Sequence, residues 1–208
     1  EMDWPRDSTT VVVEVVNPET GRIWMDRNLG AARVATSMGD PQAFGDFYQW
    51  GRATDGHQKY NSETTSVLSN SDEPGHGLFI TVSDYFSSRP WDWRNPQKPA
   101  LWQGIDGINN PCPSGFRIPT SEEWNSETET WSSGNGFGDL DPILKLPLAV
   151  SRSKYTGERQ NDGEYRHYWS STVGGFQNTE SYALNSTKWN RSLWWRKRAH
   201  GAAVRCIK

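Results

Sequence analysis

Residues 112–124 read CPSGFRIPTSEEW, and they carry the clearest local structural signal in the chain. Thr120 is a favourable N-cap, because its side-chain oxygen can accept a hydrogen bond from the amide of Glu123. The carboxylate of Glu123 can accept in return from the amide of Thr120, which completes a capping box. We therefore expect a helix that begins near Ser121 and ends by about Trp131, where glycine and serine follow.

Most segments on either side of this helix predict short strands and turns. A β-branched run at 11–16, the turn sequence NPETG at 17–21 and the apolar RIWM at 22–25 predict a hairpin. After Gly30 we expect a short helix, and at 44–51 a buried strand or turn. Further strands are expected at 146–150, 165–171, 181–184 and 202–207, with Gly157 and Gly163 marking a hairpin between the first two. Short mixed or antiparallel sheets, one or two short helices and long loops define an α+β fold class rather than alternating βαβ units.

The composition favours a single domain whose core is rich in aromatic side chains. A chain of 208 residues can bury a core as a single domain, 1–208, and its 12 tryptophans compensate for a hydrophobic content of 34%. Residues 54–110 are polar and rich in turn-forming residues, and we interpret them as a long ordered insertion. Its few apolar positions are residues 78–80, Trp91, Trp93 and Trp102.

Charge and cysteine content narrow the class of protein further. The net charge of −3 argues against a nucleic-acid-binding protein, although residues 181–208 contain no Asp or Glu and are locally basic. No run of 18 apolar residues occurs, so we expect no direct membrane insertion. Cys112 and Cys206 either close one long loop as a disulfide in an oxidising compartment or remain two buried free thiols.

Patterns for catalysis and metal binding are weak. There is no zinc-ligand spacing and no Gly-x-Ser-x-Gly elbow, so we interpret the four histidines as solvated surface groups: His57, His76, His167 and His200. Asp46, Asp139 and Asp141 could bind calcium, but the 12-residue loop that makes such a site specific is missing. We therefore expect solvated acidic loops and no cofactor, with calcium as the alternative.

The aromatic and basic run at 189–200, WNRSLWWRKRAH, is the best candidate for a functional surface. Indole and guanidinium groups offer stacking, cation–π contact and hydrogen bonding on one patch, and both are enriched in binding hot spots. The alternative is an aromatic core strand with arginines on its solvent face. Because the tryptophans and cations do not alternate with a period of two, the pattern favours an exposed loop or ragged strand.

Several segments together resemble one family, the Fibrobacter major paralogous domain. The similar segments span almost the whole chain in the family's order: residues 15–30, 47–52, 112–120, the Leu146–Pro147 pair, 168–172 and 204–206. Such domains resemble C-type lectin-like folds, and relatives serve as the variable proteins of diversity-generating retroelements. In those proteins the ligand site lies in a C-terminal segment in which adenine-directed mutagenesis changes selected codons.

The resemblance implies a variable region at about 168–206 and a binding site within it. The implied ligand-binding residues are Phe176, Asn178, Asn185, Trp189, Asn190, Ser192, Trp194, Trp195, Lys197 and His200. An Asn codon altered only at its adenines cannot become Trp, whereas the Lys codon AAG can become TGG. The three tryptophans therefore derive from Lys codons or are not diversified positions.

This resemblance predicts a non-catalytic module that binds a protein or glycan ligand on a cell or virion surface, and an extracytoplasmic location. One alternative is a polysaccharide-binding domain without diversification, whose tryptophans stack on sugar rings. A second is an enzyme of the formylglycine-generating type, whose fold is similar. Those enzymes bind copper through a pair of nearby cysteines, whereas Cys112 and Cys206 fit a structural bridge better.

Overall fold

In the computed structural model of the chain, the helix predicted from the capping box is present as α1 (Ser121–Glu129). The Thr120 side chain accepts from the Glu123 amide at 3.2 Å, and the Glu123 carboxylate accepts from the Thr120 amide at 2.8 Å. The same carboxylate is bound by Arg117 at 2.7 Å and by Arg22 at 2.8 Å. Glu123 therefore joins the helix start to two other segments.

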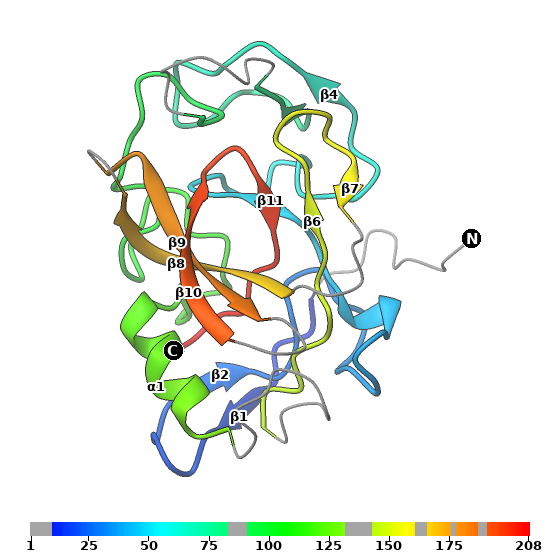
Figure 1. Cartoon of the computed structure of the whole chain (residues 1–208), viewed down its shortest axis with the longest axis vertical. Coiled ribbons are helices and arrows are strands. Elements are labelled where there is room, and N and C mark those ends of the chain that lie inside the picture. Colours follow the sequence, from blue (N-terminus) through cyan, green and yellow to red (C-terminus); the bar gives the residue numbers. More distant parts are fainter. Residues whose placement is uncertain (1–9, 83–90, 132–142, 161–165, 176–177, 187–190) are drawn as a thin grey trace.

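The structure describes residues 10–82, 91–131, 143–160, 166–175, 178–186 and 191–208. Besides α1, these ranges contain one 3₁₀ helix and eleven short strands (Figure 1). The 3₁₀ helix is η1 (Pro41–Ala43), and the strands are β1 (Glu14–Val16), β2 (Ile23–Met25), β3 (Tyr48–Gln49), β4 (Thr64–Thr65), β5 (Phe79–Ile80), β6 (Ser151–Arg152), β7 (Arg159–Gln160), β8 (Arg166–Gly174), β9 (Glu180–Ser186), β10 (Arg191–Lys197) and β11 (Gly201–Ala202).

The strands form four small sheets. β1 and β2 make the predicted antiparallel hairpin, and β4 pairs with β5 in parallel. A four-stranded sheet has the order β3-β11-β6-β7, and a three-stranded antiparallel sheet has the order β10-β9-β8. In Figure 1 the three-stranded sheet lies in front of the body of the chain, between α1 and the β6–β7 hairpin. The fold class is thus α+β, with one helix and several small sheets.

The C-terminal residues 203–207 connect four parts of the fold. Their backbone carbonyls accept from the amides of Met25, Leu29, Arg117 and Trp169, at distances of 2.8–3.0 Å. All five residues are buried. The strand expected at 202–207 is reduced to β11, which ends at Ala202, and to isolated bridges of Ala203 with Tyr168 and of Ile207 with Trp24 and Arg117.

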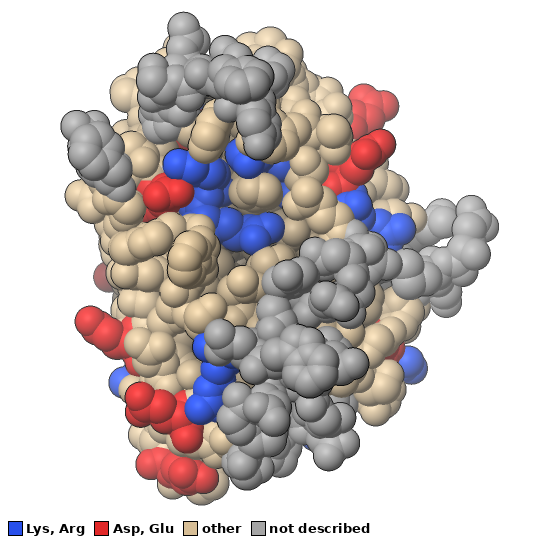
Figure 2. Space-filling model, in the orientation of Figure 1, with Lys and Arg blue, Asp and Glu red and all other residues tan. Residues whose placement is uncertain are grey.

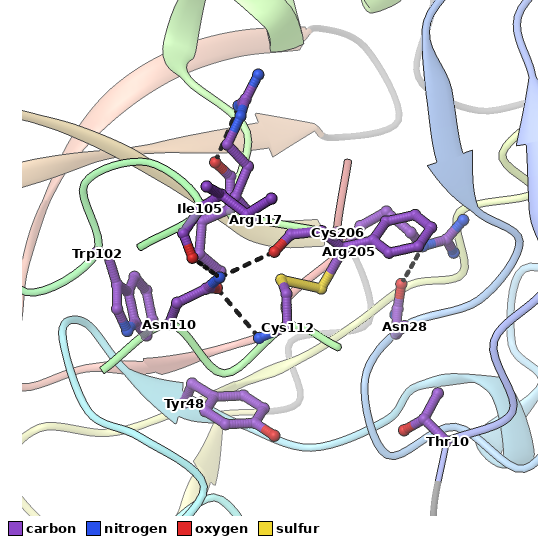
Figure 3. The surroundings of a disulfide bond; sticks show 12 residues. Thr10, Asn28, Tyr48, Trp102, Ile105, Asn110, Cys112, Arg117, Arg205 and Cys206 are labelled. Atoms are coloured by element: carbon purple, nitrogen blue, oxygen red, sulfur yellow. Dashed lines mark hydrogen bonds between the residues drawn. A yellow bond between two sulfur atoms is a disulfide. The ribbon is translucent and has the colours of Figure 1, made fainter. Parts of the chain in front are cut away.

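The two cysteines form a disulfide, which decides between the two states that the sequence left open. Cys112 and Cys206 are 94 positions apart, and their bridge ties the loop before α1 to the buried C-terminal segment. Figure 3 shows this bridge beside Asn110, which accepts from the Cys112 amide and donates to the Phe116 carbonyl. A bridge that closes so long a loop stabilises the fold chiefly by restricting the unfolded chain.

Buried tryptophans supply hydrogen-bond donors to backbone carbonyls as well as apolar surface. Trp50 donates to Ser170, Trp93 to Trp50, Trp124 to Trp169 and Trp169 to Tyr48, at 2.7–3.1 Å. A buried carbonyl without a donor is destabilising, and loops leave many carbonyls outside regular ladders. Three of these acceptor carbonyls lie in β3 and β8 and the fourth directly follows β3, so the indoles join these strands to the rest of the core.

Some predicted elements are absent or displaced. The short helix expected after Gly30 does not start there: the chain turns over residues 31–40, and a single 3₁₀ turn forms later, at Pro41–Ala43. Residues 146–150 are largely buried but carry no strand, and the hairpin begins one residue later at β6, with Gly157 in its turn. Pro147 lacks the amide that a ladder would need there.

The polar stretch 54–110 is not an appendage to the core. In its described parts, Phe79, Trp93 and Trp102 are fully or almost fully buried. Trp102 packs on Trp50 with ring centroids 5.5 Å apart, and both belong to the largest core cluster. The insertion predicted from composition is therefore part of the body of the domain.

Arg205 provides a test of this packing. Its guanidinium is buried and donates to the carbonyls of Met25 at 3.2 Å and Leu144 at 2.6 Å, and to Asn28 Oδ1 at 3.0 Å. Arg205→Met leaves these acceptors without a donor, so we expect a loss of about 3 kcal/mol or more in the free energy of unfolding. Urea denaturation measures it.

The matched control is Lys208→Met, because the side chains of Lys208 and its ion-pair partner Glu14 are 48% and 44% exposed. We expect this change to cost less than about 1 kcal/mol. Equal losses in the two variants would contradict the structural role assigned to Arg205.

Candidate functional site

Strand β10 forms the outer edge of the three-stranded sheet and presents the aromatic run. It pairs in register with β9 along its whole length, so residues 191–197 of the run form a regular strand rather than a loop or a ragged strand. Leu193 lies opposite Leu184 and packs on the cluster that contains Trp124. Since side chains alternate along a strand, Ser192 and Trp194 lie on the other face, and Trp194 is 65% exposed.

Trp195 is fixed to the sheet, in contrast to Trp194. Its ring stacks on Tyr182 of the neighbouring strand, with centroids 3.6 Å apart and an interplanar angle of 29°. The ring also lies directly over Gly174, where an added Cβ would collide with it. Only glycine permits this close approach, so Trp195 is partly a packing residue.

The ligand-binding residues implied by the resemblance fall into separate places. Phe176, Trp189 and Asn190 lie outside the described residues. Asn178 is exposed, with a positive φ of 56°. Asn185 on β9 lies opposite both Ser192 and His167, so it sits in the middle of the sheet.

Lys197 and His200 lie at the far end of β10, in a basic cluster that the sequence did not reveal. We define this cluster as Lys154, Arg196, Lys197 and His200. Lys154 Nζ is 3.3 Å from His200 Nε2, and the ammonium groups of Lys154 and Lys197 lie 5.2 Å and 4.6 Å from the centroid of the Trp91 ring. Figure 2 shows the basic side chains gathered on the face that carries β6, β10 and β11. The basic C-terminal segment of the sequence contains Arg196, Lys197 and His200. Lys154 comes from the turn after β6, and only the fold brings it to the same place.

Burial and neighbouring cations change the ionisation of this cluster. Desolvation, reinforced by the positive charges of Arg196 and Lys197, lowers the pKa of Lys154 to about 8. Desolvation also holds the pKa of His200 well below its usual value, again with Arg196 and Lys154 acting in the same direction. At neutral pH the imidazole of His200 is uncharged, and the ammonium of Lys154 is still mostly protonated.

Arg198, although part of the basic run, belongs to the scaffold. It is buried over the Trp50 ring at 4.4 Å and donates to Ser181 Oγ and to the Asn178 carbonyl. Its nearest carboxylate is that of Asp92, at 3.7 Å. Burial raises the pKa of Asp92 to about 6, although Arg198 opposes the shift.

The prediction of solvated histidines is wrong for His57 and His167, which are buried. His57 accepts from the Gln49 amide at 3.0 Å and lies 2.6 Å from Asp55. Desolvation lowers the pKa of His57 to about 4, and lowers that of His167 to about 2 with help from Arg196. Both rings are neutral structural groups, and sequence spacing carries no signal for that role.

No metal site is evident within the described ranges, where no group of three His, Cys, Asp or Glu side chains comes together. Asp46 contacts Lys59 at 3.2 Å, while Asp139 and Asp141 lie outside the described residues. A surface cavity of about 430 Å³ lies beside Asp46, and prolines that flank Cys112 form part of its wall. Calcium binding stays a prediction.

In comparisons with known proteins, no family model, no curated protein and no solved structure matches this chain. Within the described ranges, no helix combines the length and the hydropathy needed to cross a membrane.

The buried histidines make stability depend on pH. His167 has a folded pKa of about 2, far below the unfolded value of about 6.5, so the unfolded chain binds the extra proton below pH 6.5. Stability is complete above pH 6.5 and falls as the pH drops towards 5. For His167→Gln, urea denaturation from pH 7.5 to 5 should show a slope that is smaller by roughly 1 kcal/mol per pH unit. An unchanged slope would contradict a buried neutral imidazole at 167.

The two neighbouring tryptophans should differ in their effect on stability. Trp194→Ala removes an exposed ring, and we expect the free energy of unfolding to change by less than about 0.5 kcal/mol. Trp195→Ala removes the ring stacked on Tyr182, and we expect a loss of about 2 kcal/mol. Chemical denaturation of both variants measures the difference, and a larger loss for Trp194→Ala would place that ring in the core.

Proposed function

We propose that the chain is a non-catalytic, C-type lectin-like binding domain that presents β10 and its neighbours to a ligand on a cell or virion surface. The observation that carries the proposal is the exposure of Trp194 at the edge of an otherwise tightly packed sheet. An exposed indole on a rigid strand is an efficient anchor, because little side-chain entropy is lost on binding.

The contrast between fixed and exposed positions supports this function. Tyr168 and Trp169 before the run, and residues 202–207 after it, are fully buried. Between them, all seven residues of β10 are at least partly exposed. Because the buried segments before and after β10 hold the fold together, side chains on β10 can change without disrupting it. Diversification would require this tolerance.

We further propose that the domain is a variable protein of a diversity-generating retroelement, with an extracytoplasmic location. The resemblance to the Fibrobacter major paralogous domain supports it, and a protein ligand is the first candidate partner. The surrounding DNA provides the test. It should contain a reverse transcriptase gene and a near-copy of the codons for 168–208 that differs only at adenines; a locus that lacks both would leave a lectin-like domain without diversification.

A polysaccharide ligand is the second candidate, favoured by the same exposed ring, because an indole face stacks on sugars. Glycan arrays and arrays of purified surface proteins separate the two partners. For whichever probe binds, we expect Trp194→Ala to weaken binding by about ten-fold or more.

Val67→Ala is the matched control for this binding experiment, because Val67 is also an exposed apolar residue but lies outside the three-stranded sheet. We expect it to bind like the unchanged chain. Equal binding by the Trp194→Ala variant would remove β10 from the ligand surface.

A further inference from the structure

The basic cluster brings positive charge from separate segments to one place. Arg196 and Lys197 end β10, His200 lies in the turn before β11, and Lys154 follows β6. The Arg196 guanidinium is 3.1 Å from His167 Nδ1 and donates to Ser151 Oγ at 2.9 Å. These contacts direct the guanidinium across the sheet towards β6.

Within the described ranges, two carboxylates lie close to the basic run. Lys197 pairs with Glu180 at 3.0 Å, and Asp92 faces Arg198. Among the described residues, Lys154 has no carboxylate within ion-pair distance. Its ammonium instead lies 3.8 Å from the centroid of the Tyr155 ring, 5.2 Å from that of Trp91 and 3.3 Å from His200 Nε2.

The two neighbouring ammonium groups of Lys154 and Lys197 repel each other, and a nearby negative charge would offset this repulsion. Two ammonium groups share the Trp91 ring, and a neutral imidazole is the strongest acceptor that Lys154 has in the described part of the chain. Ring faces and an imidazole offset part of the repulsion between cations, but charge-assisted hydrogen bonds to an anion are about twice as strong as neutral ones. The partial burial of Lys154 would strengthen the attraction between its ammonium group and a bound anion, because screening by water is reduced.

We propose that Lys154, Arg196, Lys197 and His200 frame a binding site for one oxyanion, a carboxylate or sulfate group. The ammonium groups bind it, and the rings of Trp91 and Tyr155 form apolar walls beside the charges. The assignment of this anion to a larger ligand rests on the proposed binding function, because Lys197 and His200 border the surface that presents Trp194. An acidic group on that ligand would then decide which partners β10 accepts.

The chemistry favours a single compact anion over a nucleic-acid backbone. A phosphodiester chain needs a stripe of cations that tracks successive charges, whereas Lys154 and Lys197 converge on the single ring of Trp91. The chain as a whole is acidic, with a net charge of −3, so a long polyanion would meet repulsion beyond the cluster.

The test is a titration of the full chain with sodium sulfate, and separately with sodium acetate, at constant ionic strength. Lysine side-chain NMR follows the Cε and Nζ signals of Lys154 and Lys197. We expect saturable shifts at both residues and a rise in the pKa of Lys154 above its starting value of about 8. Shifts that grow linearly without saturation, as simple screening would give, overturn the proposal.

Two variants and a matched control locate the site. Lys154→Gln and Lys197→Gln should each weaken sulfate binding by about ten-fold. Lys98→Gln removes a lysine that pairs with Asp72 at 2.6 Å and whose side chain is 35% exposed, close to the 28% of Lys197, and it should leave sulfate binding unchanged. Equal losses in all three variants would show a diffuse charge effect and overturn the site. Two cluster variants are used so that misfolding of one does not hide the result.

The same titration separates this inference from the proposed function. If sulfate binding is absent while Trp194→Ala still abolishes binding of an array probe, the anion site fails and the binding surface stands. If sulfate binds at the cluster but no probe depends on Trp194, the anion site stands alone. Competition of sulfate with a bound probe assigns the anion to the ligand, and binding of sulfate without competition assigns it to free inorganic anion.

Discussion

The fold depends on buried side-chain donors that satisfy the carbonyls of loops. Arg152 donates to the carbonyls of His57, Lys59, Ser62 and Gly157, and its guanidinium lies 4.1 Å from the centroid of Phe79. Buried Arg152 thus satisfies loop carbonyls that helices and sheets would satisfy elsewhere, because a buried carbonyl must find a donor. The buried rings of Trp50, Trp93, Trp124 and Trp169 add hydrogen-bond donors to backbone carbonyls as well as apolar area.

The same constraint explains why the candidate surface is placed at one edge. Residues 203–207 bond to four separate segments and carry one half of the disulfide, so the chain on the C-terminal side of β10 is immobilised. On its other side, β9 is held between β10 and β8. Only the outer edge and one face of β10 are then available to a partner, which makes Trp194 accessible while Trp195 remains against Gly174. Rigid support with limited exposure is the arrangement that binding without catalysis requires.

The aromatic and basic run therefore has three different roles within ten residues. Trp194 is the exposed anchor of the proposed ligand surface, Arg198 is a buried link between loops, and Lys197 with Arg196 borders the proposed anion site. These roles differ because the strand ends at Lys197 and the chain then turns inward towards β11. The charge of these side chains does not distinguish their roles. Burial makes Arg198 a structural residue, whereas its neighbour Lys197 stays accessible.

The sequence by itself determined the features that local chemistry dictates. The capping box at Thr120, the first hairpin and the α+β class need only neighbouring residues, and each is present. The sequence did not determine the strand at 191–197, the burial of His57 and His167, or the state of Cys112 and Cys206. These depend on segments far apart in the chain, and only the tertiary structure places Lys154 beside His200 and Trp91. The physical reason is that burial and non-local hydrogen bonding, rather than local propensity, decide which polar groups stay charged and which become part of the core.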